Sequence, residues 1–169
     1  MSSKTLLFSL FSYKAWADEE LLTLLGGIEQ QLSKQDLGEI LETINHAHVV
    51  DRIFAANARK QKHDYRDTGT EQTPTLPQLS KAIRETDRWY LAYVEQLAPE
   101  ELVETIRFAF TDGSPGKMSR EEMLAHVITH AGYHRGEVGR ILTRLSKPTS
   151  PDTFTGYLHR AEPARRTAA

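Results

Sequence analysis

Three histidines stand at intervals of four residues: His126, His130 and His134. In a helix this spacing places all three on one face. At a rise of about 1.5 Å per residue, however, the first and the third start roughly 12 Å apart along the axis. That is too far for both to bind one ion at ~2.0–2.1 Å together with the middle one. Helix geometry therefore favours an adjacent pair of imidazoles, the commonest metal ligands.

A third ligand must come from another segment, which offers His46 and His48. These two residues lie about 200° apart around a helix and cannot both face one site. Apolar residues share the helix face of His46, whereas charged residues neighbour His48. We therefore expect His46 to point inward and His48 to lie at the rim. The alternative is that these are surface or hydrogen-bonded core histidines, the usual situation for an isolated histidine.

Other metal chemistries need spacings that the sequence lacks. A peptidase of the HExxH type requires Glu directly after its first His, but Val127 follows His126 and Ala131 follows His130. Di-iron bundles need Glu-x-x-His pairs, and no Glu precedes a His by three residues. There is no C-x-x-C-H haem signal either. The remaining option is one divalent ion on three neutral imidazoles, with open positions typical of a catalytic site. Such an ion could activate water or hold and polarise a thiol or carbonyl.

Composition limits the class of protein. The chain has 169 residues, 39% of them hydrophobic, and predicts one folded domain. It has no cysteine, so any metal must be held by His, Asp or Glu. A formal net charge of −2 provides no global field for a polyanion, and we expect no nucleic-acid partner. The longest early apolar run, residues 6–10, is interrupted and followed by charges. We therefore expect no membrane association and a cytoplasmic protein.

Apolar residues recur at helical spacing in four blocks, over about residues 3–32, 37–62, 77–98 and 119–145. The sequence from Ser119 to Glu122 is a capping box that marks the start of the fourth block. Before it, residues 100–118 are typical of a short strand or extended arm. Four such helices bury their apolar faces most simply as a bundle, with the site between helices. We therefore predict an all-α, metal-binding four-helix bundle over residues 1–148. Residues 149–169 should form a tail partly packed on the bundle and frayed from Arg160 onward.

The sequence resembles the DinB/YfiT-like family of metalloenzymes as far as about Leu158. Residues 13–18, YKAWAD, resemble the family's Y-x-x-W-A-N, and residues 44–54, INHAHVVDRIF, resemble L-N-H-I-L-x-A-D-R-I-W. Residues 126–138, HVITHAGYHRGEV, resemble H-V-x-N-H-x-x-Y-H-R-G-Q-V, and residues 151–158 are similar to a closing D-x-x-x-Y-L segment. The chain departs from this pattern at Thr129 and Glu137, where Asn and Gln are common.

The resemblance implies a metal triad of His46, His130 and His134. It also implies that His126, Tyr133 and Trp16 lie in or beside the pocket, although simple packing would explain His126 equally well. The expected fold is an up-down-down-up bundle that forms a homodimer. The expected cofactor is nickel or zinc, with iron or manganese as alternatives. Relatives include S-transferases and isomerases that use a low-molecular-weight thiol such as bacillithiol, mycothiol or glutathione as cosubstrate.

The leading hypothesis is a metal-dependent thiol S-transferase that acts on a small-molecule electrophile in detoxification or stress response. A metal-dependent hydrolase is the second hypothesis, although no carboxylate has an evident general-base spacing. A third is a non-catalytic bundle that an ion stabilises or that binds a ligand. Two arginines near the triad, Arg135 and Arg140, are expected on a solvated helix face.

Overall fold

The computed structural model describes residues 2–166, and most of them are helical. The long helices are α1 (Ser3–Ile28), α2 (Lys34–Ala58), α3 (Leu76–Gln96) and α5 (Arg120–Arg144). The short ones are η1 (Glu29–Gln31), α4 (Pro99–Leu102), α6 (Phe154–Ala161) and η2 (Pro163–Arg166). Strands β1 (Thr105–Ala109) and β2 (Pro115–Ser119) form an antiparallel hairpin. The prediction of a mainly helical chain with a hairpin before its last long helix is confirmed.

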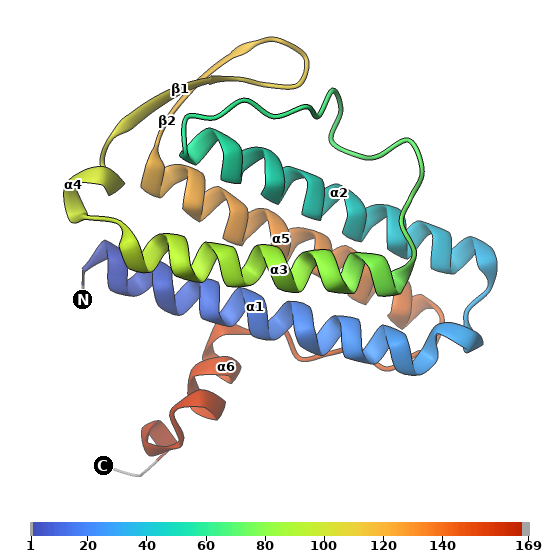
Figure 1. Ribbon diagram of the computed structural model, residues 1–169. Coiled ribbons are helices and arrows are strands. Elements are labelled where there is room, and N and C mark those ends of the chain that lie inside the picture. The colour runs from blue at the N-terminus through green and yellow to red at the C-terminus, as the bar shows by residue number, and fades with distance from the viewer. Residues whose placement is uncertain (1, 167–169) are drawn as a thin grey trace.

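The four long helices lie alongside one another (Figure 1). A tight turn reverses the chain between α1 and α2, whereas the connection at residues 59–75 runs back along the length of α2. For this reason α2 and α3 run in the same direction, opposite to α1 and α5. Helix α2 packs mainly on α5, and α1 packs mainly on α3. None of the helices within residues 2–166 is long and apolar enough to cross a membrane.

Local signals set most helix ends. The capping box predicted at Ser119 is confirmed, with its hydroxyl accepting from the Glu122 N–H at 3.2 Å. Helix α2 ends at Ala58 rather than near Lys62, because Lys60 adopts a φ of 58°. The N–H groups of Lys60 and the next residue then donate to carbonyls of the last helical turn, which is a Schellman ending.

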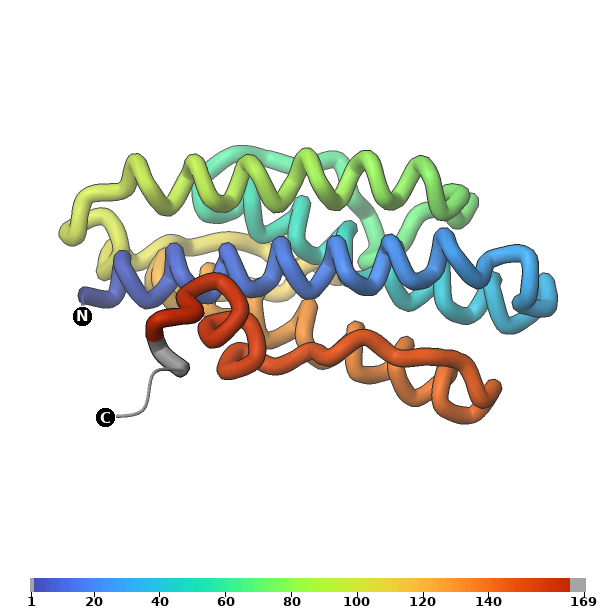
Figure 2. Tube along the Cα trace, turned by 90° about the horizontal axis from the view of Figure 1, so that it is seen from below, coloured from blue at the N-terminus to red at the C-terminus, as the bar shows by residue number. Residues whose placement is uncertain are grey.

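The segment after α5 is more ordered than expected. Instead of fraying from Arg160, it continues as α6 to residue 161 and then forms η2. Figure 2 shows that this segment returns beside α1. There the ring of Tyr13 meets those of Phe154 and Tyr157 at centroid distances of 5.6 and 6.2 Å. The last part of the expected frayed end, residues 167–169, lies outside the described residues.

The buried apolar residues form two clusters at opposite ends of the long helices. One cluster contains Leu7 and Phe11 of α1 and extends to Ile128 of α5. The other begins at Leu21 and includes Leu142 of α5. Each long helix supplies apolar residues to both clusters. Polar residues lie along each helix between these two apolar sets. The core is therefore divided by a polar layer, which we define by its buried members: Lys14, Asp18, Asp51, Thr86, Asp87 and Arg135.

Lys14 is the centre of this layer, although it is only 1% exposed. Its Nζ lies 2.8 Å from Asp18, 2.9 Å from Asp51 and 2.8 Å from Asp87, so it links α1 to α2 and α3. Burial lowers the pKa of the Lys14 ammonium, but the three carboxylates outweigh burial and hold that pKa well above its usual value. Lys14 therefore stays charged inside the protein.

Arg135 extends the layer to α5 and the C-terminal segment. Its guanidinium lies 2.9 Å from Asp18 and 2.7 Å from Asp152. The expectation that Arg135 occupies a solvated helix face is therefore wrong: its side chain is 6% exposed. Periodicity alone could not show this, because the acidic partners come from distant parts of the sequence.

Candidate metal centre

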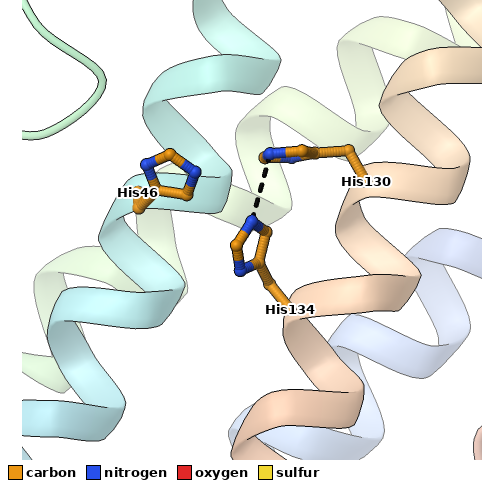
Figure 3. Close-up of side chains that lie close together, drawn as sticks. All are labelled: His46, His130 and His134. Carbon is orange, nitrogen blue, oxygen red and sulfur yellow. Dashed lines mark hydrogen bonds between the residues drawn. The ribbon is translucent and has the colours of Figure 1, made fainter.

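His46, His130 and His134 meet between α2 and α5 (Figure 3). One ring nitrogen from each residue lies within 4.8 Å of the other two. The Nε2 atoms of His130 and His134 are 3.1 Å apart, which the i, i+4 spacing explains. The His46 ring completes the group from the facing helix, at a centroid distance of 4.6 Å from His134. The structure thus brings together the three residues that the sequence placed in a triad.

Hydrogen bonds orient two of the three rings. The Nδ1–H of His46 donates to the Thr68 carbonyl at 3.0 Å, because a carbonyl can only accept. The Nδ1–H of His134 likewise donates to Oε2 of Glu137 at 2.6 Å. In both residues Nε2 therefore retains its lone pair. A carboxylate or carbonyl behind a ligating imidazole is the usual support of a metal-binding histidine.

The third ring, that of His130, has fewer hydrogen-bond partners. The Nδ1 atom of His130 is buried and has no hydrogen-bond partner among the described residues. Burial and, to a smaller extent, the neighbouring His134, His126 and His46 together lower the pKa of His130 to about 4. Burial also lowers the pKa of His46. At neutral pH both rings are uncharged, the form that coordinates a cation.

The donor set fits a divalent ion. Two imidazole nitrogens bound tetrahedrally to one ion at ~2.1 Å are about 3.4 Å apart, so a closure of at most about 1.4 Å brings the widest pair into range. All three histidines are partly buried rather than enclosed.

The loop that follows α2 takes part in this site, which the sequence reading missed. Besides the Thr68 carbonyl, it supplies Thr70, whose hydroxyl accepts from the Asn45 amide at 2.9 Å. Asn45 precedes His46, so two neighbouring residues of α2 fasten the loop beside the triad. Glu137 was also missed as a partner of His134, although a carboxylate three residues on from a histidine shares its helix face.

The other predicted pocket residues have different positions. His126 lies beside the triad, with its ring 5.2 Å from that of His130 and 4.5 Å from that of Phe54. Tyr133 is 66% exposed, and its ring stands perpendicular to His134 at 5.1 Å. His126 thus contributes to the buried side of the site, and Tyr133 to its solvent side.

Trp16 and His48 lie outside the triad. The Trp16 ring lies 5.7 Å from Tyr157, 6.4 Å from Tyr13 and under the guanidinium of Arg160, so it packs where the C-terminal segment meets α1. His48 Nε2 is 3.1 Å from the Thr86 hydroxyl. Burial, followed by the charge of Lys14, lowers the pKa of His48 to about 4. His48 is therefore not part of the triad, and its ring contacts Thr86 of α3. Together with His134 it lines a small internal cavity, so it lies in the interior rather than at the expected rim.

One member of the triad, His134, borders a cavity of about 30 Å³. The same cavity is lined by Lys14, Asp18 and Asp51 of the polar layer. A space of this size holds about one water molecule and offers it several polar partners. One candidate partner is the Oδ1 atom of Asp51, which is buried without a hydrogen bond to any described residue.

Comparison with known proteins gives a consistent result. The sequence profile of the DinB family matches residues 1–166. The chain is also 20% identical over 161 residues to Protein DinB of Bacillus subtilis (strain 168). That alignment covers 89% of this chain and 92% of the relative. No solved structure matches the chain.

Proposed function

This chain belongs to the DinB family, and we propose that it is a metal-dependent enzyme that transfers a small thiol to an electrophile. One observation carries the proposal: nitrogens of His46, His130 and His134, from two facing helices, lie within 4.8 Å of one another. We assign α1, α2, α3 and α5 to the up-down-down-up four-helix bundle that the family resemblance implies. We propose nickel or zinc for the site, with the three Nε2 atoms as ligands.

A divalent ion bound there would supply Lewis acidity, which favours the deprotonated form of a thiol and keeps it nucleophilic. The chain has no cysteine, so the thiol must come from a cosubstrate. The His126 ring lies beside that of His130, and its only hydrogen bond to a described side chain is through its backbone carbonyl, which accepts from the Thr129 hydroxyl. Burial lowers the pKa of His126, so its neutral ring can accept the thiol proton at neutral pH.

The hydrogen-bond and ion-pair partners of the nearby carboxylates favour thiol transfer over hydrolysis. Glu137 touches the triad but already accepts the Nδ1–H of His134, an arrangement that orients the ring rather than abstracting a proton from water. Asp18 and Asp51 lie across the cavity, where both face the Lys14 ammonium. Hydrolysis needs a general base close to the attacking water. Asp18 is engaged with Lys14 and Arg135, and the unpaired Oδ1 of Asp51 is buried in the polar layer and is not part of the three-histidine group.

The test combines metal analysis with an activity screen. The purified protein, His46→Ala and His134→Ala are analysed for metal content, with His159→Ala on α6 as the matched control. We expect metal loss in the first two variants and an unchanged content in the control. The same proteins are then assayed with several low-molecular-weight thiols and a chromogenic electrophile.

Thiol transfer that a chelator abolishes and that both triad variants lack would support the enzyme. Retention of metal in both variants would reject the triad. Metal loss without activity toward any thiol would reject the transferase and favour a metal-stabilised bundle or a ligand-binding protein.

A further inference from the structure

A groove of about 500 Å³ lies at the end of the bundle that carries the hairpin. One wall is the end of α2 with the first residues of the following loop, including Asn57, Lys62 and Arg66. The other wall is β1 and the start of the hairpin turn, including Arg107 and Phe110. Figure 1 shows these two segments on the same side of the molecule. None of the triad histidines lines this groove.

The groove is positively charged. Lys62, Arg66 and Arg107 are exposed at its edge, and none of them forms an ion pair with another described residue. A fourth cation, Lys60, is paired with Glu104. No carboxylate is among the described residues that line the groove. In a chain whose formal net charge is −2, this concentration of unpaired cations is a local feature that suits an anion.

Aromatic rings lie beside these cations. Phe108 faces Gly116 across the hairpin, where a Cβ atom would come within 2.5 Å of the ring. The glycine therefore leaves room for the Phe108 ring to lie over the opposite strand. Phe110 packs against Phe108 at a centroid distance of 5.0 Å and is 47% exposed. A flat ring can stack on such an exposed aromatic side chain.

Two polar atoms of the lining residues have no partner. The Nδ2 atom of Asn57 and the Nδ1 atom of His63 are buried and form no hydrogen bond with a described residue. Asn57 is only 7% exposed, so its amide is fixed in the lining rather than extended into solvent. Unpartnered buried polar groups are uncommon, and a water, an ion or a functional role usually accounts for them.

We propose that this groove binds a small organic anion that joins phosphate groups to a flat ring, in the chemical class of a nucleoside diphosphate. Lys62, Arg66 and Arg107 would hold the phosphates through charge-assisted hydrogen bonds. The exposed face of Phe110 would stack on the ring. The volume lies within the ~300–1,000 Å³ range of small-molecule sites. This proposal is independent of the metal centre and goes beyond the proposed transferase.

The test is a titration of the full chain with ADP carrying a fluorescent N-methylanthraniloyl group, in EDTA so that no bound metal contributes. Unlabelled ADP, inorganic pyrophosphate and a short single-stranded RNA serve as competitors. Arg107→Gln is compared with Arg88→Gln, which removes an exposed α3 arginine outside the groove. Phe110→Ala is compared with Phe8→Ala, which removes a 39% exposed ring on α1.

We expect saturable binding that unlabelled ADP displaces, that pyrophosphate displaces more weakly, and that added salt weakens. Arg107→Gln and Phe110→Ala should each weaken binding about tenfold, the loss of one charge-assisted hydrogen bond or one stacked ring. The two control variants and His134→Ala should bind as the unmodified chain does. This last result separates the groove from the metal centre.

Three results would overturn the assignment. One is an absence of saturable ADP binding. Another is an equal loss of ADP affinity in the groove variants and in their controls, which would indicate nonspecific electrostatic attraction. The third is competition by RNA at far lower concentration than by ADP, which would assign the groove to a nucleic-acid strand instead.

Discussion

Replacing Asp87 by Asn should change how the stability of the protein depends on pH. Burial raises the pKa of Asp87 to about 7, despite the opposing charge of Lys14. An unfolded Asp has a pKa of about 3.9. Between about pH 4 and 7 the folded protein therefore retains a proton that the unfolded chain has released. Because the folded state then binds more protons, the free energy of unfolding contributed by Asp87 falls as the pH rises through this window.

The size of the effect follows from the pKa difference. Each pKa unit corresponds to about 1.4 kcal/mol, so a shift of about three units gives an upper limit near 4 kcal/mol. About 1 kcal/mol of this change in the free energy of unfolding occurs below pH 4.5. The remaining change of about 3 kcal/mol occurs between pH 4.5 and 7.5. Asp87→Asn lacks the titrating group but keeps an oxygen for Lys14. Its stability relative to the unmodified protein should therefore increase by about 3 kcal/mol over that range.

Urea unfolding at several pH values, with EDTA present, measures this difference. The histidines with lowered pKa, His48 and His130, stabilise the fold increasingly as pH rises from about 4 to 6.5. Asp51, whose pKa burial raises to about 6, acts in the opposite direction. All three groups are present in both proteins, so their contribution cancels in the comparison. Asp64→Asn, in the exposed loop after α2, is the matched control and should show a nearly constant difference. If Asp87→Asn also gives a constant difference from pH 4.5 to 7.5, Asp87 does not retain a proton and the reasoning is wrong.

Three further predictions concern single hydrogen bonds. Glu137→Ala should lower the affinity for the metal about 10–100-fold through loss of the Nδ1 acceptor of His134, whereas Glu137→Gln, which keeps an accepting oxygen, should lose much less. Isothermal titration with zinc or nickel would show this, and equal affinity of the alanine variant would mean that Glu137 does not orient the ring. Ser119→Ala removes the N-cap of α5 and should cost about 1 kcal/mol in urea unfolding; an unchanged midpoint would contradict the capping role. Tyr90→Phe removes the buried bond from the Tyr90 hydroxyl to the Asp51 carbonyl, at 2.6 Å, and should cost about 1 kcal/mol. Tyr133→Phe, at a 66% exposed position, should leave the free energy of unfolding almost unchanged. An equal loss of stability in these two variants would refute a stabilising role for the Tyr90 hydrogen bond.

Features encoded by neighbouring residues were predictable from the sequence. The cap at Ser119 and the pairing of His130 with His134 depend on residues three and four apart. Helix α6 was not predicted, because eight residues are too few to be stable alone and this helix depends on ring contacts with α1. The buried position of Arg135 was also missed, since its partners Asp18 and Asp152 become neighbours only in the folded chain.

The polar layer offers a reason why His46 and His134 keep the spacing that a shared ion needs. Buried ion pairs contribute little net stability, because the desolvation of the charges offsets their attraction, but removing one partner is costly. Asp18 accepts from both Lys14 and Arg135, and Lys14 also meets Asp51 on α2. Sliding α2 or α5 along α1 would break one of these pairs and leave a buried charge without its partner. Arg135 follows His134 directly and Asp51 lies five residues beyond His46, so the charges that fix the two helices also fix the two ligands. We therefore attribute to this layer a role in specifying the geometry of the metal centre rather than in adding to the stability of the bundle.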